Sequence, residues 1–277
     1  MHLTSLDLIL AAITLVAATV NGGLGYGFSS ISVPLALLWV SNQVLSPALV
    51  LVEIFINLVA MAVNARALPQ VFRRVLPLLA GVLPGAVLGT FALRMADPGL
   101  LRLAIYAVLL PLVLLQVAGV RRPLRREPLA GAGVGALYAA TTISGPPLSL
   151  LLSNQGYTKD HFRAALALFR TVESLITGLL YLSLGLFTAE SLRISTTVAP
   201  SVLVGIPLGY LLLRRLPNET FRKLCLGADV LIVGFGLLRA LARHSLLLAA
   251  AGGLAVSLLV ALLWRRTRSL ETAEARS

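Results

Sequence analysis

Residues 82–94 read VLPGAVLGTFALR, and 120 positions later residues 202–214 read VLVGIPLGYLLLR. Seven of these 13 positions are identical, which is more than a Leu- and Ala-rich composition produces by itself. At the same offset Glu53 matches Glu173, and Arg102 matches Arg222. The chain therefore contains two related halves, and each half has a glutamate inside a long apolar stretch. Duplicated apolar halves with acids in mid-segment are typical of membrane transporters.

The composition supports an all-α integral membrane protein. Hydrophobic residues make up 58% of the 277 residues and charged residues only 12%, whereas a soluble domain has about 25% charged residues. The net charge of +12 comes from short basic clusters between apolar runs, as topology signals do, and not from a soluble basic face for nucleic acid. A single cysteine, Cys225, and three scattered histidines predict no disulfide, metal or cofactor.

Apolar runs long enough for membrane spans occur nine times. A spanning helix needs about 20 apolar residues, and charge clusters separate the runs. We also expect residues 8–20 to belong to the membrane domain and not to a cleaved signal peptide, because no Lys or Arg precedes them. The predicted segments are 6–40, 45–64, 75–93, 100–120, 129–153, 162–186, 192–213, 221–238 and 246–264.

The first and fifth segments contain helix breakers at equivalent places. Residues 21–27 read NGGLGYG and precede Pro34, while Gly131, Gly133 and Gly135 precede residues 141–147, which read TTISGPP. Gly and Pro interrupt helices, and an interrupted helix in lipid survives only where it lines protein or an aqueous cavity. Each half is therefore predicted to begin with a broken or re-entrant helix.

Basic residues distinguish two topologies. If the first and fifth segments each enter and leave on one side, 17 basic residues lie on the cytoplasmic side and 5 outside. If the fifth segment instead crosses the membrane, the count becomes 10 inside and 12 outside. The positive-inside rule favours the first arrangement.

The favoured topology predicts a polytopic helical bundle of two inverted repeats. Each repeat has one re-entrant element and three spans, so the second copy is upside down relative to the first. One further span follows the repeats, and the C-terminal tail is predicted to be cytoplasmic. The predicted units are repeat 1 (6–120), repeat 2 (129–243), the additional span (246–264) and the tail (265–277).

These motifs resemble the sulfite exporter TauE/SafE family of membrane permeases. The likeness lies in the Gly-rich break followed by Val33-Pro34-Leu35, in residues 144–148 (SGPPL), and in Lys159-x-x-x-Arg163-Ala164. It covers most of the chain. The resemblance implies a secondary transporter of sulfite or a sulfonate in the bacterial inner membrane, and no enzyme. A carrier of a non-sulfur organic acid and an anion channel remain open, as does the oligomeric state.

The two breaks are the predicted substrate site. Ser32 and Ser144 precede prolines and are expected to cap half-helices, whose free N–H groups suit an oxyanion. Opposed half-helices would meet near the middle of the bilayer. Arg170 joins this set because it is the one basic residue deep inside an apolar segment. The predicted substrate-binding residues are Asn21, Gly22, Gly23, Gly25, Ser32, Pro34, Thr142, Ser144, Gly145, Pro146, Pro147 and Arg170.

Buried acids are the candidates for proton or ion coupling: Glu53, Glu173 and Asp229. A charge at the bilayer centre is costly, so acids there are functional candidates. Arg170 precedes Glu173 by three residues, and this spacing predicts an ion pair on one helix face. Glu53 has Val50 at the matching place, so we expect Glu53 to be the acid that protonates reversibly.

Two further residue patterns predict helix packing. The Gly85-x-x-x-Gly89 and Gly205-x-x-x-Gly209 stripes are expected to let helices approach closely. Asn57, Asn64 and Asn21 are expected to form hydrogen bonds between helices, with substrate binding as the alternative. No ATP-binding motif occurs, so the energy for transport would come from an ion gradient or from the gradient of the substrate itself.

Overall fold

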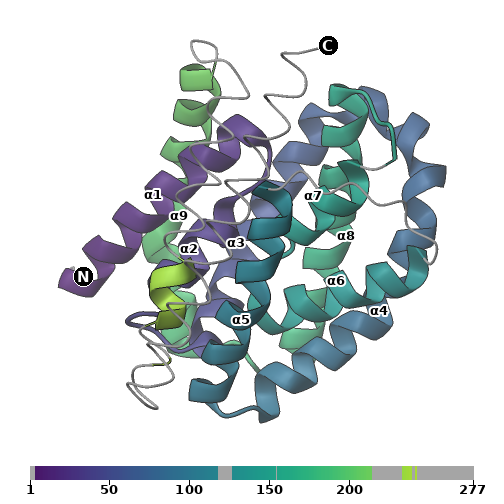
Figure 1. Ribbon diagram of the computed structural model, residues 1–277. Helices are drawn as coiled ribbons and strands as arrows, with labels where there is room; N and C mark the ends of the chain where they lie inside the picture. Colours follow the sequence, from purple (N-terminus) through teal and green to yellow (C-terminus); the bar gives the residue numbers. More distant parts are fainter. Residues whose placement is uncertain (1–3, 118–126, 154, 214–232, 239–240, 242–277) are drawn as a thin grey trace, which may run out of the picture.

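A computed structural model describes residues 4–117, 127–153, 155–213, 233–238 and 241. Within these residues the regular structure is helical and contains no strand. Figure 1 shows the helices as α1 Ser5–Leu24, α2 Phe28–Ala36, α3 Asn42–Val63, η1 Ala65–Ala67, α4 Leu68–Met95, α5 Pro98–Val117, α6 Glu127–Thr141, α7 Gly145–Ser153, α8 Lys159–Ser183 and α9 Ala189–Leu213.

Five of these helices are long and apolar enough to cross a membrane: α1, α3, α4, α8 and α9. Large apolar side chains remain exposed on them, among them Leu88, Leu179 and Val204. Such a broad apolar surface is suited to lipid and not to water. The all-α polytopic prediction is confirmed. The predicted span 246–264 and the tail 265–277 lie outside the described residues, as do most of span 221–238 and Asp229.

Local sequence explains where two of the helices begin. At the start of α1, the Thr4 hydroxyl accepts a hydrogen bond from the Asp7 N–H, and the Asp7 carboxylate accepts one from the Thr4 N–H. This capping box satisfies two N–H groups that the first helical turn leaves free. The Thr158 hydroxyl caps α8 by accepting from the His161 N–H.

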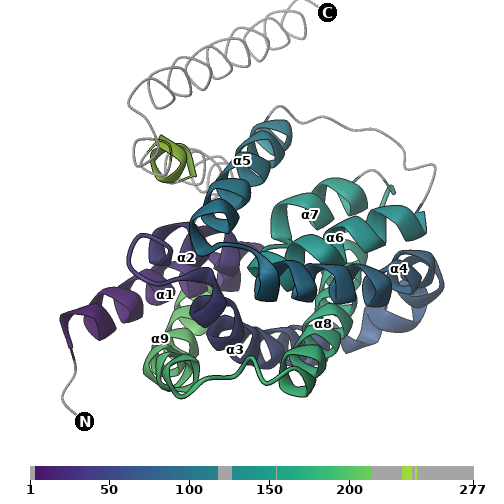
Figure 2. The same cartoon turned by 90° about the horizontal axis from the view of Figure 1, so that it is seen from below.

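The helices pack in pairs that join the two halves of the chain. Helix α1 packs along α9, helix α6 packs along α4, and α3 packs against α8. Figures 1 and 2 show α1 with α9 on one side of the bundle, α4 with α6 on the other, and α3 and α8 between them. Contacts of Asn57 with Arg170 and of Ile54 with Gly178 show that α3 and α8 run antiparallel.

Glycine stripes allow the two outer pairs to approach closely, as predicted. A Cβ on Gly85 or Gly89 would overlap the Ala132 or Ala136 backbone of α6. A Cβ on Gly209 would likewise overlap the Thr19 backbone of α1. Gly131 of α6 packs on the Leu78 backbone of α4 in the same way. Backbones in direct contact gain dispersion energy, which replaces the hydrophobic driving force that lipid cannot supply.

Both predicted interruptions are present, although the second lies later than its glycines suggested. The first lies between α1 and α2, where Gly25 and Gly27 have φ of 81° and 107°. The second lies at residues 142–144 between α6 and α7. Gly131, Gly133 and Gly135 do not break the chain, because they lie inside α6, and the first and third pack against α4.

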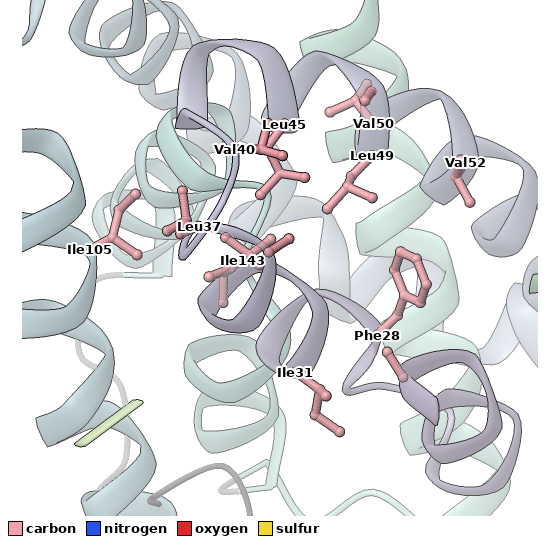
Figure 3. Close-up of a cluster of buried hydrophobic side chains, with 14 of the residues drawn as sticks. Phe28, Ile31, Leu37, Val40, Leu45, Leu49, Val50, Val52, Ile105 and Ile143 are labelled. Atoms are coloured by element: carbon pink, nitrogen blue, oxygen red, sulfur yellow. The ribbon is translucent and has the colours of Figure 1, made fainter. Parts of the chain in front are cut away.

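Two apolar clusters fill the bundle. The larger one collects buried side chains of α1, α2, α3 and α5 around residues such as Phe28, Leu37, Leu49 and Ile105, and Figure 3 shows part of it. The second joins α4, α6, α7 and α8 around Val75, Val82 and Phe169.

Candidate functional site

A chain of polar contacts joins the middles of α3 and α8. Arg170 Nη2 donates to Glu53 Oε1 at 3.0 Å, and the two side chains are 2% and 0% exposed. One turn away, Asn57 Nδ2 donates to the Arg170 carbonyl at 3.2 Å and to Ser174 Oγ at 3.3 Å. Thr171 Oγ1 returns a hydrogen bond to the Asn57 carbonyl at 3.1 Å. These contacts fix the register of α3 against α8.

The ion pair corrects the expected partner of Arg170. The sequence spacing predicted a pair with Glu173 and left Glu53 alone, whereas the guanidinium hydrogen-bonds to Glu53 of the other half. Helix α3 packs against α8 and brings Glu53 within hydrogen-bonding distance of the Arg170 side chain. Glu173, and not Glu53, is the carboxylate without a hydrogen-bonded cation.

Glu173 is fully buried, and neither carboxylate oxygen has a hydrogen-bond partner. Arg170, Glu53 and Ser144 are the groups that interact with it, and Ser144 Oγ also lacks a hydrogen bond. Glu53 has Tyr138 and Ser29 beside it, but its Oε2 has no partner either. Two buried carboxyl groups therefore lie near one arginine, which hydrogen-bonds to only one of them.

The two helix breaks begin alike and lie side by side. Gly25 ends α1 with φ of 81°, and its N–H donates to the Asn21 carbonyl. Thr142 ends α6 with φ of 58°, and its N–H donates to the Tyr138 carbonyl. Each is followed by two residues before the next helix starts. A Cβ on Gly145 would lie 3.7 Å from Gly27 N, so the starts of α2 and α7 are neighbours.

The expected capping roles are only partly correct. Ser32 and Pro34 lie inside α2, and Ser32 Oγ donates to the Phe28 carbonyl of the same helix. The helix begins earlier because Gly25 and Gly27 supply the left-handed backbone that turns the chain. Pro146 and Pro147 do lie in the first turn of α7, where a missing N–H is tolerated. Ser144 immediately precedes that turn, without a side-chain cap.

A cavity of about 460 Å³ reaches the buried arginine. The last turn of α1 with Gly25 forms one wall, the C-terminal half of α3 and the N-terminal half of α8 form two others, and α9 closes the fourth. Polar groups line it sparsely among aliphatic ones. The lining residues are Asn21, Gly22, Gly23, Gly25, Ile56, Asn57, Val59, Ala60, Val63, Asn64, Arg163, Ala167, Arg170, Ile206, Pro207 and Tyr210.

The cavity gathers one half of the predicted substrate set and not the other. It brings Arg170 together with the four residues of the first break. The remaining members are buried beside it and do not line it: Ser32, Pro34, Thr142, Ser144, Gly145, Pro146 and Pro147. Asn57 forms the predicted interhelical hydrogen bonds, whereas Asn64 donates to Ala60 of its own helix.

Sequence reasoning missed three side chains of the site. Tyr138 and Ser29 flank Glu53, and the exposed Arg163 stands on the cavity wall. The place of Tyr138 in the sequence could have identified it. Tyr138 precedes the left-handed Thr142 by four residues, just as Asn21 precedes Gly25. Among the described residues no group of three or more His, Cys, Asp or Glu gathers to hold a metal.

Comparison with known proteins identifies the family of the chain. The family model described as Sulfite exporter TauE/SafE matches residues 10–237, which include both breaks, the α3–α8 pair and the cavity. Searches among curated proteins and among solved structures found no match. The family match spans well over half of the 277 residues. The chain therefore belongs to the sulfite exporter TauE/SafE family of membrane transporters, which move sulfite or related anions.

Proposed function

We propose that this protein is a secondary transporter that binds a small anion, a sulfur oxyanion or a sulfonate, against Arg170 and moves it by alternating access. The observation that carries the proposal is the cavity, because it connects the surface of the bundle with a buried guanidinium. Guanidinium groups bind oxyanions through several N–H donors at once. Arg170 uses Nη2 on Glu53, and its Nε has no hydrogen-bond partner.

The surroundings of Arg170 suit a small anion of mixed character. Asn57 and Asn21 supply amide groups, and Gly22 lies against the Ile206 backbone of α9. Ile56, Ala60 and Ile206 make much of the remaining wall apolar. The exposed Arg163 adds a positive charge along the path toward Arg170, which attracts anions.

Helix packing supports inverted repeats as the moving parts. The equivalent helices α3 and α8 run antiparallel, and each half's first helix packs on the other half's long helix, α1 on α9 and α6 on α4. Such an exchange of partners is what two opposed copies related by a twofold axis would give. In the inner-membrane topology with a cytoplasmic tail, Arg66 and Arg163 face the cytoplasm, so the cavity would open to that side.

Counterflow in proteoliposomes tests the proposal. Vesicles loaded with unlabelled sulfite, thiosulfate, taurine or sulfoacetate should transiently accumulate the same labelled anion, because only a carrier exchanges one molecule for another. Arg170→Gln should abolish the exchange. Arg193→Gln is the matched control, since Arg193 also pairs with a carboxylate, that of Asp7 at 2.6 Å, but lies away from the cavity.

The same assay separates the alternatives. Flux that rises linearly with concentration and shows no counterflow would indicate an anion channel. Exchange of a carboxylic acid without sulfur, with none of the four anions competing, would move the substrate to that class. Exchange that survives unchanged in Arg170→Gln would contradict the proposed site.

A further inference from the structure

The charges around the inner end of the cavity do not compensate an additional negative charge, so an anion that binds there without a proton would be unpaired. Among the described residues, Arg170 from α8 is the basic group at this inner end, and its Nη2 already donates to Glu53 Oε1 at 3.0 Å. From the described residues the other charged or titratable groups that face Glu53 are Glu173 on α8 and Tyr138 on α6. An arriving anion therefore meets a centre that is neutral at best.

A buried carboxylate without partners takes up a proton, because the charged form cannot be solvated there. This describes Glu173, whose two oxygens lack hydrogen bonds and whose side chain is fully buried. Glu53 differs, since its Oε1 accepts from Arg170. The geometry thus distinguishes the two acids, because Glu53 is paired with a cation and Glu173 is not.

We propose that the substrate anion and one proton enter the site together, with Glu53 as the group that takes the proton. This inference rests on the proposed function. The anion binds the guanidinium of Arg170 in place of the Glu53 carboxylate, and a proton from the aqueous end of the cavity adds to a carboxylate oxygen of Glu53. Oε2 is available for it, because it has no hydrogen-bond partner.

The exchange balances charge and atoms. Before binding, Arg170 and the Glu53 carboxylate sum to zero. After a singly charged anion such as hydrogensulfite binds, Arg170 and the anion also sum to zero, and Glu53 is a neutral acid. No bond other than the new O–H forms or breaks. The α3–α8 interface therefore never has to hold an unpaired charge, which would be strongly destabilising.

Proteoliposomes that contain a pH-sensitive dye test this coupling, with potassium and valinomycin holding the membrane potential at zero. The probe is the anion among sulfite, thiosulfate, taurine and sulfoacetate that exchanges in counterflow. An acidic exterior should drive its accumulation, about tenfold per pH unit when one proton accompanies each anion. Anion entry should also acidify the lumen beyond what protein-free vesicles show.

Glu53→Gln separates coupling from transport. Glutamine keeps the shape of the neutral acid but takes up no proton, so in whatever counterflow Glu53→Gln retains, the accumulation driven by the pH gradient should fall to about onefold. Asp7→Asn is the matched control, because Asp7 is the acid of the other described ion pair, with Arg193, and it should keep full accumulation. Accumulation by Glu53→Gln equal to that of the wild type would overturn the inference.

The wild type alone also tests the coupling if Glu53→Gln does not fold. Counterflow without lumen acidification and without a response to the pH gradient would overturn proton coupling and leave the proposed transport intact. Loss of counterflow for every anion would instead overturn the proposed function. Acidification that accompanies anion entry supports the inference without any variant.

Discussion

Two glycines of the same helix should respond to alanine in opposite directions. Gly131 and Gly133 both lie inside α6. A Cβ on Gly131 would overlap the Leu78 carbonyl oxygen of α4 and lie 2.8 Å from its carbonyl carbon, whereas a Cβ on Gly133 would meet nothing within 4 Å. Gly133 is exposed on the surface of the bundle. The pair thus separates helix packing from helix propensity.

The expected magnitudes follow from two terms. Alanine in a helix interior is favoured over glycine by about 0.5–1 kcal/mol, and both variants gain this. Overpacking costs about 1–3 kcal/mol, and for Gly131→Ala the cost lies near the upper end because backbone atoms of Leu78 cannot rotate away. Gly133→Ala should stabilise, and Gly131→Ala should be less stable than the wild type by roughly 2 kcal/mol.

Thermal denaturation in detergent, followed by the monodisperse fraction on size exclusion, checks both signs. A difference of about 3 kcal/mol between the variants corresponds to roughly 6–12 °C at 2–4 °C per kcal/mol. Because membrane proteins commonly unfold irreversibly, all proteins are heated at one rate and only their order is interpreted. Equal shifts of the two alanine variants, in either direction, would refute the close α4–α6 contact as the reason for Gly131.

Three further predictions address the interior. Arg170→Met or Glu53→Leu alone should each cost about 3–5 kcal/mol, because each leaves a buried partner unpaired, while the double variant should recover most of the loss; additive losses in the four denaturation midpoints would contradict a coupled pair. Tyr181→Phe removes the 2.6 Å hydrogen bond to the Ala139 carbonyl and should cost about 1–3 kcal/mol in the same assay, whereas an unchanged midpoint would argue against that bond. Thr142→Gly should stabilise the protein by about 1 kcal/mol, because glycine adopts the left-handed backbone without strain. Gly25→Ala should destabilise the protein by a similar amount. Midpoint shifts of the same sign for the two variants would contradict the equivalence of the two breaks.

Much of the fold could be predicted because lipid restricts the choices. The length of the apolar segments predicted the spanning helices α3, α4, α8 and α9. The glycine stripes predicted the helix surfaces that are in close contact. The role of a glycine is ambiguous, however, because glycine occurs both where a helix is interrupted and where two helices cross closely. Gly25 turns the chain, whereas Gly131 packs against α4. Only the neighbouring helix decides between these roles, and a single sequence does not name that neighbour.

The site was predictable in its residue types and less so in its pairs. Glu53, Glu173 and Arg170 are all buried at the centre, as acids and a base in apolar segments suggested. Their pairing depended on the register between α3 and α8, which Asn57, Thr171 and Ser174 set through hydrogen bonds across the interface. Local spacing favoured the wrong glutamate because it takes no account of the facing helix.

The repeat places two glutamates in equivalent positions, but the single arginine makes the positions unequal. Val50 stands where the second copy has Arg170, and its side chain packs near Gly178 of α8. The cavity lies on the arginine's side of the α3–α8 crossing. On the opposite side, Asn42 Nδ2 donates to the Ala140 carbonyl and the Tyr181 hydroxyl donates to the Ala139 carbonyl. An exchange of the two halves by symmetry would therefore not recreate the anion site. If the protein alternates between two open states, Arg170 must itself face both sides in turn, and Glu53, which holds it in the unloaded state, is the group that such a movement has to release.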